Sequence, residues 1–167
     1  GNMHETQSVA SISKVMTAMI AIEYGNLKDE WKVSDAILKA DGSSIYLQVG
    51  EQVTLEDLLY GLMLRSGNDA AVEIAVHVGG DEAHFVEMMN EKAKALGMNN
   101  TLFRNPSGLD EADGGNISSA YDMALLMRYA MQDETFARIT SSKYYDMGTE
   151  RWQNKNKLLF SYDKTTG

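Results

Sequence analysis

A serine and a lysine three residues apart, Ser11 and Lys14, stand at the head of an apolar segment. Residues i and i+3 share one face of a helix, so the Lys14 amine can reach the Ser11 hydroxyl. The helix N-terminus adds a partial positive charge and free N–H groups, which favour an alkoxide and a developing oxyanion. Lys14 must be neutral to accept a proton, and burial lowers the pKa of a lysine. The pair therefore predicts a nucleophile and its general base.

The Ser-x-x-Lys spacing occurs twice in the chain, so the spacing alone is weak evidence. The second copy, Ser161 to Lys164, follows an apolar triplet and precedes a turn-like end. Only the first copy begins an apolar helix, where the mechanism above applies. A structural alternative remains open at this point: Ser11 is an ordinary residue of a helix start, and Lys14 reaches solvent.

A second candidate is the turn Ser66-Gly67-Asn68, which separates two apolar segments. Its hydroxyl and carboxamide could face Ser11, with Ser66 passing a proton and Asn68 orienting Lys14 or a substrate amide. A turn that only joins two helices would have the same sequence, with Asn68 or Asp69 capping the second helix.

Apolar residues at helical spacing predict the elements that would position these side chains. Helices are expected over residues 10–24, from 55 to about 65, from about 70 to 78, from 81 to 96, from 120 to about 130 and around 134–139. Brief strands or loops are expected near 31–33, 37–38 and 45–47, and strands near 143–147 and 151–153. The chain therefore reads as a helix-rich body with little strand.

Composition excludes several classes of protein. The chain has 167 residues and a formal charge of −9 without a basic cluster, which argues against nucleic acid as a partner. It has no cysteine and no apolar run long enough to span a membrane. The histidines His4, His77 and His84 make no convincing metal set, because His77 and His84 lie on different predicted helices. We therefore expect no metal site.

Four segments together resemble the D-alanyl-D-alanine carboxypeptidases, the low-molecular-mass penicillin-binding proteins of the serine-acyltransferase and β-lactamase-like superfamily. In chain order they are Ala10-Ser11-Ile12-Ser13-Lys14-Val15-Met16-Thr17-Ala18, Leu62-Met63-Leu64-Arg65-Ser66-Gly67-Asn68-Asp69-Ala70-Ala71, Asn105-Pro106-Ser107-Gly108-Leu109 and Ser119-Ala120-Tyr121-Asp122-Met123-Ala124. They keep the order of the family and extend over most of the chain.

The resemblance implies an α+β fold of the β-lactamase and transpeptidase type, a helical subdomain packed on an antiparallel sheet. It implies that Ser11 attacks the bond between two terminal D-alanines of a peptidoglycan stem peptide, with Lys14 as the base. Ser66 and Asn68 would be further catalytic residues and would bind substrate. β-Lactam antibiotics would acylate Ser11, and the protein would act outside the cytoplasm, at the bacterial cell surface or associated with the membrane.

The chain departs from the family at its third signature, Lys-Thr-Gly on a sheet strand. The segment Lys164-Thr165-Thr166-Gly167 has one residue more, which on a strand would reverse the facing of its side chains. We therefore expect residues 1–167 to be the central part of one catalytic domain, cut at both ends, mainly the helical subdomain with the sheet largely missing. Part of the family's oxyanion hole lies on the missing strand, so we expect little turnover from these residues alone.

Three alternatives remain open. A class A β-lactamase shares the first two motifs, but no Glu-x-x-Leu-Asn segment follows Asn68 to supply its deacylating carboxylate. A serine esterase would share the first motif and act on simple esters. A non-catalytic helical interaction module of the same fold would differ in that Ser11 could not be acylated.

Overall fold

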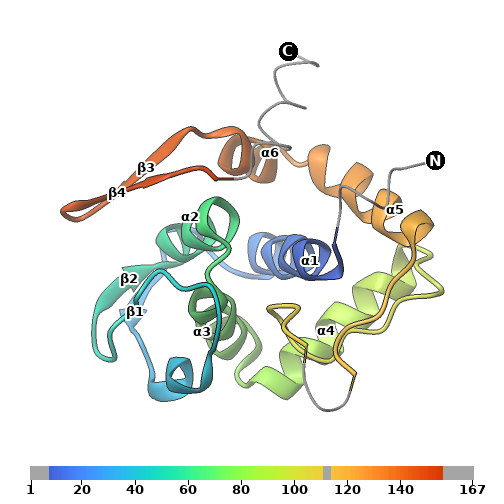
Figure 1. Cartoon of the computed structure of the whole chain (residues 1–167), viewed down its shortest axis with the longest axis horizontal. Coiled ribbons are helices and arrows are strands. Elements are labelled where there is room, and N and C mark those ends of the chain that lie inside the picture. The colour runs from blue at the N-terminus through green and yellow to red at the C-terminus, as the bar shows by residue number, and fades with distance from the viewer. Residues whose placement is uncertain (1–7, 111–113, 156–167) are drawn as a thin grey trace.

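The computed structural model describes residues 8–110 and 114–155 (Figure 1). In these ranges the α-helices are α1 (Val9–Tyr24), α2 (Leu55–Arg65), α3 (Asn68–Gly79), α4 (Glu82–Ala95), α5 (Ala120–Met131) and α6 (Glu134–Ser141). A short 3-10 helix, η2, spans Asp35–Lys39. The strands are β1 (Glu30–Lys32), β2 (Gln52–Thr54), β3 (Tyr144–Met147) and β4 (Glu150–Gln153). The predicted helix-rich body with little strand is confirmed.

Helix α1 lies in the middle of the helical body and contacts each of the other five α-helices (Figure 1). Every residue from Ile12 to Ala21 is buried, because this segment is apolar almost all round and can pack on several neighbours. Its partners contribute large buried side chains, among them Leu58, Phe85 and Phe136. The helix that carries Ser11 and Lys14 is therefore the rigid centre of the fold.

The strands form two separate antiparallel pairs. β1 pairs with β2, with Trp31 opposite Val53, and β3 pairs with β4, with Tyr145 opposite Trp152. The strand pieces considered at 37–38 and 45–47 do not form. The first is part of η2, and the backbone N–H groups of Ile45 and Leu47 are bound by a side chain instead of a neighbouring strand.

Polar side chains fix where several helices begin. Thr54 and Asp57 form a reciprocal capping box at α2, and Ser119 caps α5 by accepting from the Asp122 N–H. The predicted cap of α3 is wrong. Its N-cap is Gly67, which provides no side-chain cap, and Asn68 and Asp69 lie inside the helix with their side chains bound elsewhere.

Candidate active site

The N-terminus of α1 presents Ser11 to solvent. Ser8 is the N-cap: its hydroxyl accepts from the Ser11 N–H at 3.1 Å and lies 3.2 Å from the Ser11 hydroxyl oxygen. Ser11 is thus the third residue of α1 and is exposed, whereas the ten residues that follow it are buried. Its oxygen stands at the positive end of a long buried helix, where a negative charge is stabilised.

Lys14 lies one turn further along α1 and does not reach solvent, so the structural alternative considered for it is wrong. Its side chain is 8% exposed, and its amine donates to the backbone carbonyl of Ser107 at 2.9 Å. Burial, and secondly the positive charge of Lys155, lower the pKa of Lys14 from 10.5 to about 8. At pH 7 about a tenth of this amine is therefore neutral and able to accept a proton.

The loop of residues 104–109 holds the Lys14 amine in place. Thr17, one turn after Lys14, donates to the carbonyl of Pro106 at 2.6 Å, so two consecutive carbonyls of the loop bind α1. Gly108 has a φ of +83°, and a Cβ there would lie 2.5 Å from Ala10 Cα. Only glycine allows this close approach between loop and helix.

The turn between α2 and α3 carries the other predicted site residues. Ser66 adopts the left-handed conformation, with φ 55° and ψ 39°, and is half-buried. Asn68 is 6% exposed and donates to the Asp41 carbonyl at 2.6 Å, but its Oδ1 is buried without a hydrogen-bond partner among the described residues. A buried oxygen without a donor is unfavourable, so Asn68 has an acceptor available for an amine or an amide N–H.

The segment around Gly42 lies between the Asn68 turn and the Lys14 loop. A Cβ on Gly42 would lie 2.8 Å from Asn68 Nδ2 and 3.8 Å from Leu109 Cδ1. Asn68 of the turn and Leu109 of the loop that binds Lys14 therefore both border Gly42. In the described ranges no hydrogen bond joins Ser66 to Ser11 or to Lys14.

Asp69 fixes the segment that covers the turn. Its buried carboxylate accepts from the Ser44 hydroxyl at 2.8 Å, the Ile45 N–H at 3.1 Å and the Leu47 N–H at 3.0 Å. Sequence reasoning assigned this residue to a helix cap and missed this role. It also missed the Ser107 carbonyl, because a backbone acceptor carries no side-chain signature.

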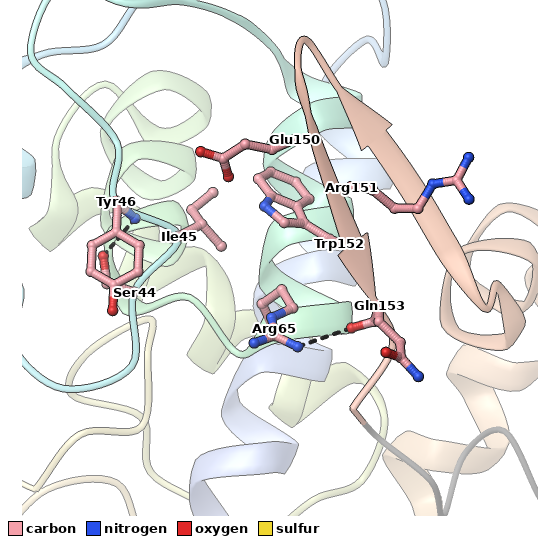
Figure 2. A pocket seen from close by; sticks show the side chains of 8 residues that line it. All are labelled: Ser44, Ile45, Tyr46, Arg65, Glu150, Arg151, Trp152 and Gln153. Carbon is pink, nitrogen blue, oxygen red and sulfur yellow. Dashed lines mark hydrogen bonds between the residues drawn. The ribbon is translucent and has the colours of Figure 1, made fainter.

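A surface pocket of about 260 Å³ lies beside the end of α2 (Figure 2). It is lined by Ser44, Ile45, Tyr46, Arg65, Glu150, Arg151, Trp152 and Gln153. Arg65, the residue before Ser66, donates to the Gln153 carbonyl at 3.1 Å (Figure 2). None of the four predicted catalytic side chains lines this pocket, so it adjoins the turn but is separate from the Lys14 amine.

The histidines that the structure describes have structural partners. His77 pairs with Asp29 at 2.6 Å and stacks on Trp31, and His84 contacts the Gly79 carbonyl through Nδ1. His4 lies outside the described residues, as do Ser161 and the segment from Lys164 to Gly167. Across residues 8–110 and 114–155 no three acidic, histidine or cysteine side chains gather as a metal site, and no helix could cross a membrane.

The lowered pKa of Lys14 predicts a pH-dependent stability. Between pH 8 and 10.5 the unfolded chain still holds the Lys14 proton that the folded chain has released, so the free energy of unfolding rises with pH. Lys14→Met should abolish this rise in the free energy of unfolding, which is at most about 3 kcal/mol. Urea unfolding of both proteins across this range measures it. Identical slopes in the two proteins would contradict the assignment.

Comparison with known proteins gives concordant matches. The family pattern described as D-alanyl-D-alanine carboxypeptidase matches residues 1–167. The D-alanyl-D-alanine carboxypeptidase DacF of Bacillus subtilis is 37% identical, over 99% of this chain and 45% of its own length. DacC of Escherichia coli is 36% identical, over 96% of this chain and 43% of its own length. The chain thus spans less than half the length of these curated relatives.

Solved structures share the arrangement of the helical body. The D-alanyl-D-alanine carboxypeptidase from Mycobacterium tuberculosis superposes with a TM-score of 0.84 at 35% identity, covering 91% of this chain and 59% of that one. Penicillin binding protein 6B from Escherichia coli gives a TM-score of 0.80 at 33% identity, covering 90% of this chain and 50% of that one. The expected fold, of which this chain is mainly the helical part, is confirmed.

Proposed function

Because the chain belongs to the D-alanyl-D-alanine carboxypeptidase family, we propose that it carries the nucleophile and base of an enzyme that trims peptidoglycan stem peptides ending in D-Ala-D-Ala. We assign the activity to a protein of the full length of these relatives, since DacF and DacC are more than twice as long as their matched segments. The observation that carries the proposal is Lys14: a buried amine with a pKa of about 8, one helical turn from an exposed serine.

In the proposed reaction Ser11 Oγ attacks the carbonyl carbon between the two terminal D-alanines. The Ser11 proton passes to neutral Lys14, and the tetrahedral oxyanion forms at the positive end of α1. When the C–N bond breaks, the proton passes on to the leaving amine, and free D-alanine departs. The remaining peptide is an ester on Ser11, which water hydrolyses with Lys14 again accepting a proton.

Ser66 and Asn68 form one wall of the proposed cleft. The free Oδ1 of Asn68 would accept a hydrogen bond from the substrate amide or from Lys14. The left-handed backbone of Ser66 sets the direction of its hydroxyl at the turn, where it would bind substrate and relay a proton to the leaving group. These residues orient the peptide, and Ser11 and Lys14 perform the covalent step.

β-Lactam antibiotics would react with the same serine. Their strained amide imitates the D-Ala-D-Ala bond, and opening of the ring leaves an acyl-enzyme on Ser11 that water clears slowly. The proposed substrate is part of the cell wall, so the protein would act outside the cytoplasm. The proposed chemistry uses no metal or organic cofactor.

The test measures release of the C-terminal alanine, D or L, by the full-length protein from an acylated tripeptide ending in D-Ala-D-Ala. We expect release from this peptide, much slower release from the matched peptide ending in D-Ala-L-Ala, and little turnover by residues 1–167 alone. Penicillin should inhibit the reaction stoichiometrically. Rapid multiple-turnover hydrolysis of penicillin, or equal cleavage of both peptides, would contradict the proposal and favour a β-lactamase or an esterase.

A further inference from the structure

Asn116 lies in the loop before α5 and binds the same segment that holds Lys14. Its side chain is 7% exposed. Its Oδ1 accepts from the Arg104 N–H at 2.6 Å and from the Asn105 N–H at 3.1 Å. Its Nδ2 donates to the Asn105 carbonyl at 3.0 Å and to the Ser13 hydroxyl at 2.8 Å. One carboxamide thus uses both of its donors and both of its acceptor positions.

These four contacts join three parts of the chain. Ser13 is completely buried in α1 between Ser11 and Lys14, and its hydroxyl donates to the Val9 carbonyl at 2.6 Å. The Ser13 oxygen is therefore oriented to accept from Asn116. The other three contacts fix the start of the loop whose Ser107 carbonyl binds the Lys14 amine. Asn116 links the loop to α1 one residue away from Lys14.

A second carboxamide, Asn105, closes the same loop from within. Its Oδ1 accepts from the Gly108 N–H at 2.7 Å, and its Nδ2 donates to the Leu109 carbonyl at 2.9 Å. With its shape fixed by Asn105, the loop can move relative to α1 only as a unit. The hydrogen bonds from Asn116 to Ser13 and from Thr17 to Pro106 oppose that movement.

We propose that Asn116 is a positioning residue: it holds the loop of residues 104–109 against α1 and thereby places the Ser107 carbonyl on Lys14 and keeps water from the amine. Asn116 does not touch Lys14 or Ser11 and acts through the loop. The proposal deepens the function proposed above, because it concerns the residue assigned there as the base. The charged neighbour that acts on Lys14 is Lys155, while Arg104 of the loop donates to the Gly115 carbonyl at 2.9 Å.

The test compares the pKa of the Lys14 amine in the protein and in Asn116→Ala, by NMR titration of isotope-labelled lysine. Burial is the main cause of the lowered value, so freeing the loop and admitting water should raise the pKa by about one pH unit. Ser13→Ala, which removes one of the four contacts, should give a smaller rise. If Asn116→Ala does not fold, the pKa of Lys14 in Ser13→Ala still tests the proposal.

Asn90→Ala is the matched control. The Asn90 carboxamide also binds a backbone segment: it donates to the Phe103 carbonyl and accepts from the Phe103 N–H, each at 2.8 Å. Its loss should lower stability but leave the pKa of Lys14 unchanged. An unchanged pKa in both Asn116→Ala and Ser13→Ala, or an equal rise in Asn90→Ala, would overturn the proposal.

The rate of penicillin acylation gives a second readout. A rise of one pH unit in the pKa of Lys14 reduces its neutral fraction at pH 7 about tenfold, and the acylation rate of Asn116→Ala should fall by the same factor. This loss should recover as the pH is raised. The NMR titration does not depend on catalysis, so it tests the positioning role of Asn116 even if the proposed function is wrong. Acylation by penicillin tests the proposed function. A loss of rate that is equal at every pH would contradict the positioning role.

Discussion

Lys14→Met should slow the acylation of Ser11 by penicillin about 10²–10⁴-fold, the effect typical of removing a general base. Methionine keeps an unbranched apolar stem of similar size in a buried site, so α1 should remain packed. The fold should be at least as stable at neutral pH, because a buried amine is removed. The rate is measured by the growth of the covalent adduct in intact-mass spectra.

The pH dependence of the acylation rate distinguishes the loss of a base from other causes of a slower reaction. In the unsubstituted protein the acylation rate should rise with pH through about 8, where Lys14 loses its proton, and this rise should be absent in Lys14→Met. Lys28→Met is the control, since Lys28 is an exposed loop lysine and its loss should change neither rate nor profile. An acylation rate for Lys14→Met within threefold of the original would show that another group is the base.

Ser11→Ala should reduce D-alanine release by roughly 10⁴–10⁶-fold, as expected for loss of a covalent nucleophile. The side chain is exposed at the third position of α1, so the free energy of unfolding should change by less than about 0.5 kcal/mol. Turnover assays and urea unfolding on the same samples separate the two effects. The same chemical change at Ser142, which follows α6, should leave release unaffected. Substantial release by Ser11→Ala would refute the assignment of the nucleophile.

The helices could be predicted from the sequence because their signals are local. The apolar run after Ser11, the Thr54 capping box and the stop at Gly25 each depend on residues within one or two turns. That Ser11 and Lys14 share one face of α1 follows from helical geometry alone. Local sequence is therefore sufficient to predict the elements that carry the four candidate residues.

Other features of the site depend on tertiary contacts and could not be predicted from the sequence. The partner of Lys14 is a backbone carbonyl 93 residues away, so neither its burial nor its lowered pKa has a local signal. Asp69 has the residue type of a helix cap, but it binds the segment around Ile45 instead and prevents the strand considered there. Asn116 belongs to no recognised sequence motif, and its four contacts are seen only in the folded structure.

We infer that Ser11 is a nucleophile activated by its place on α1 and by Lys14. The most direct measurement is intact-mass spectrometry of the full-length protein and of its Ser11→Ala variant after incubation with a penicillin. We expect the unsubstituted protein to gain the mass of one penicillin and the variant to gain none. Adducts on both would place the nucleophile elsewhere, and adducts on neither would identify the chain as part of a non-catalytic module of this fold.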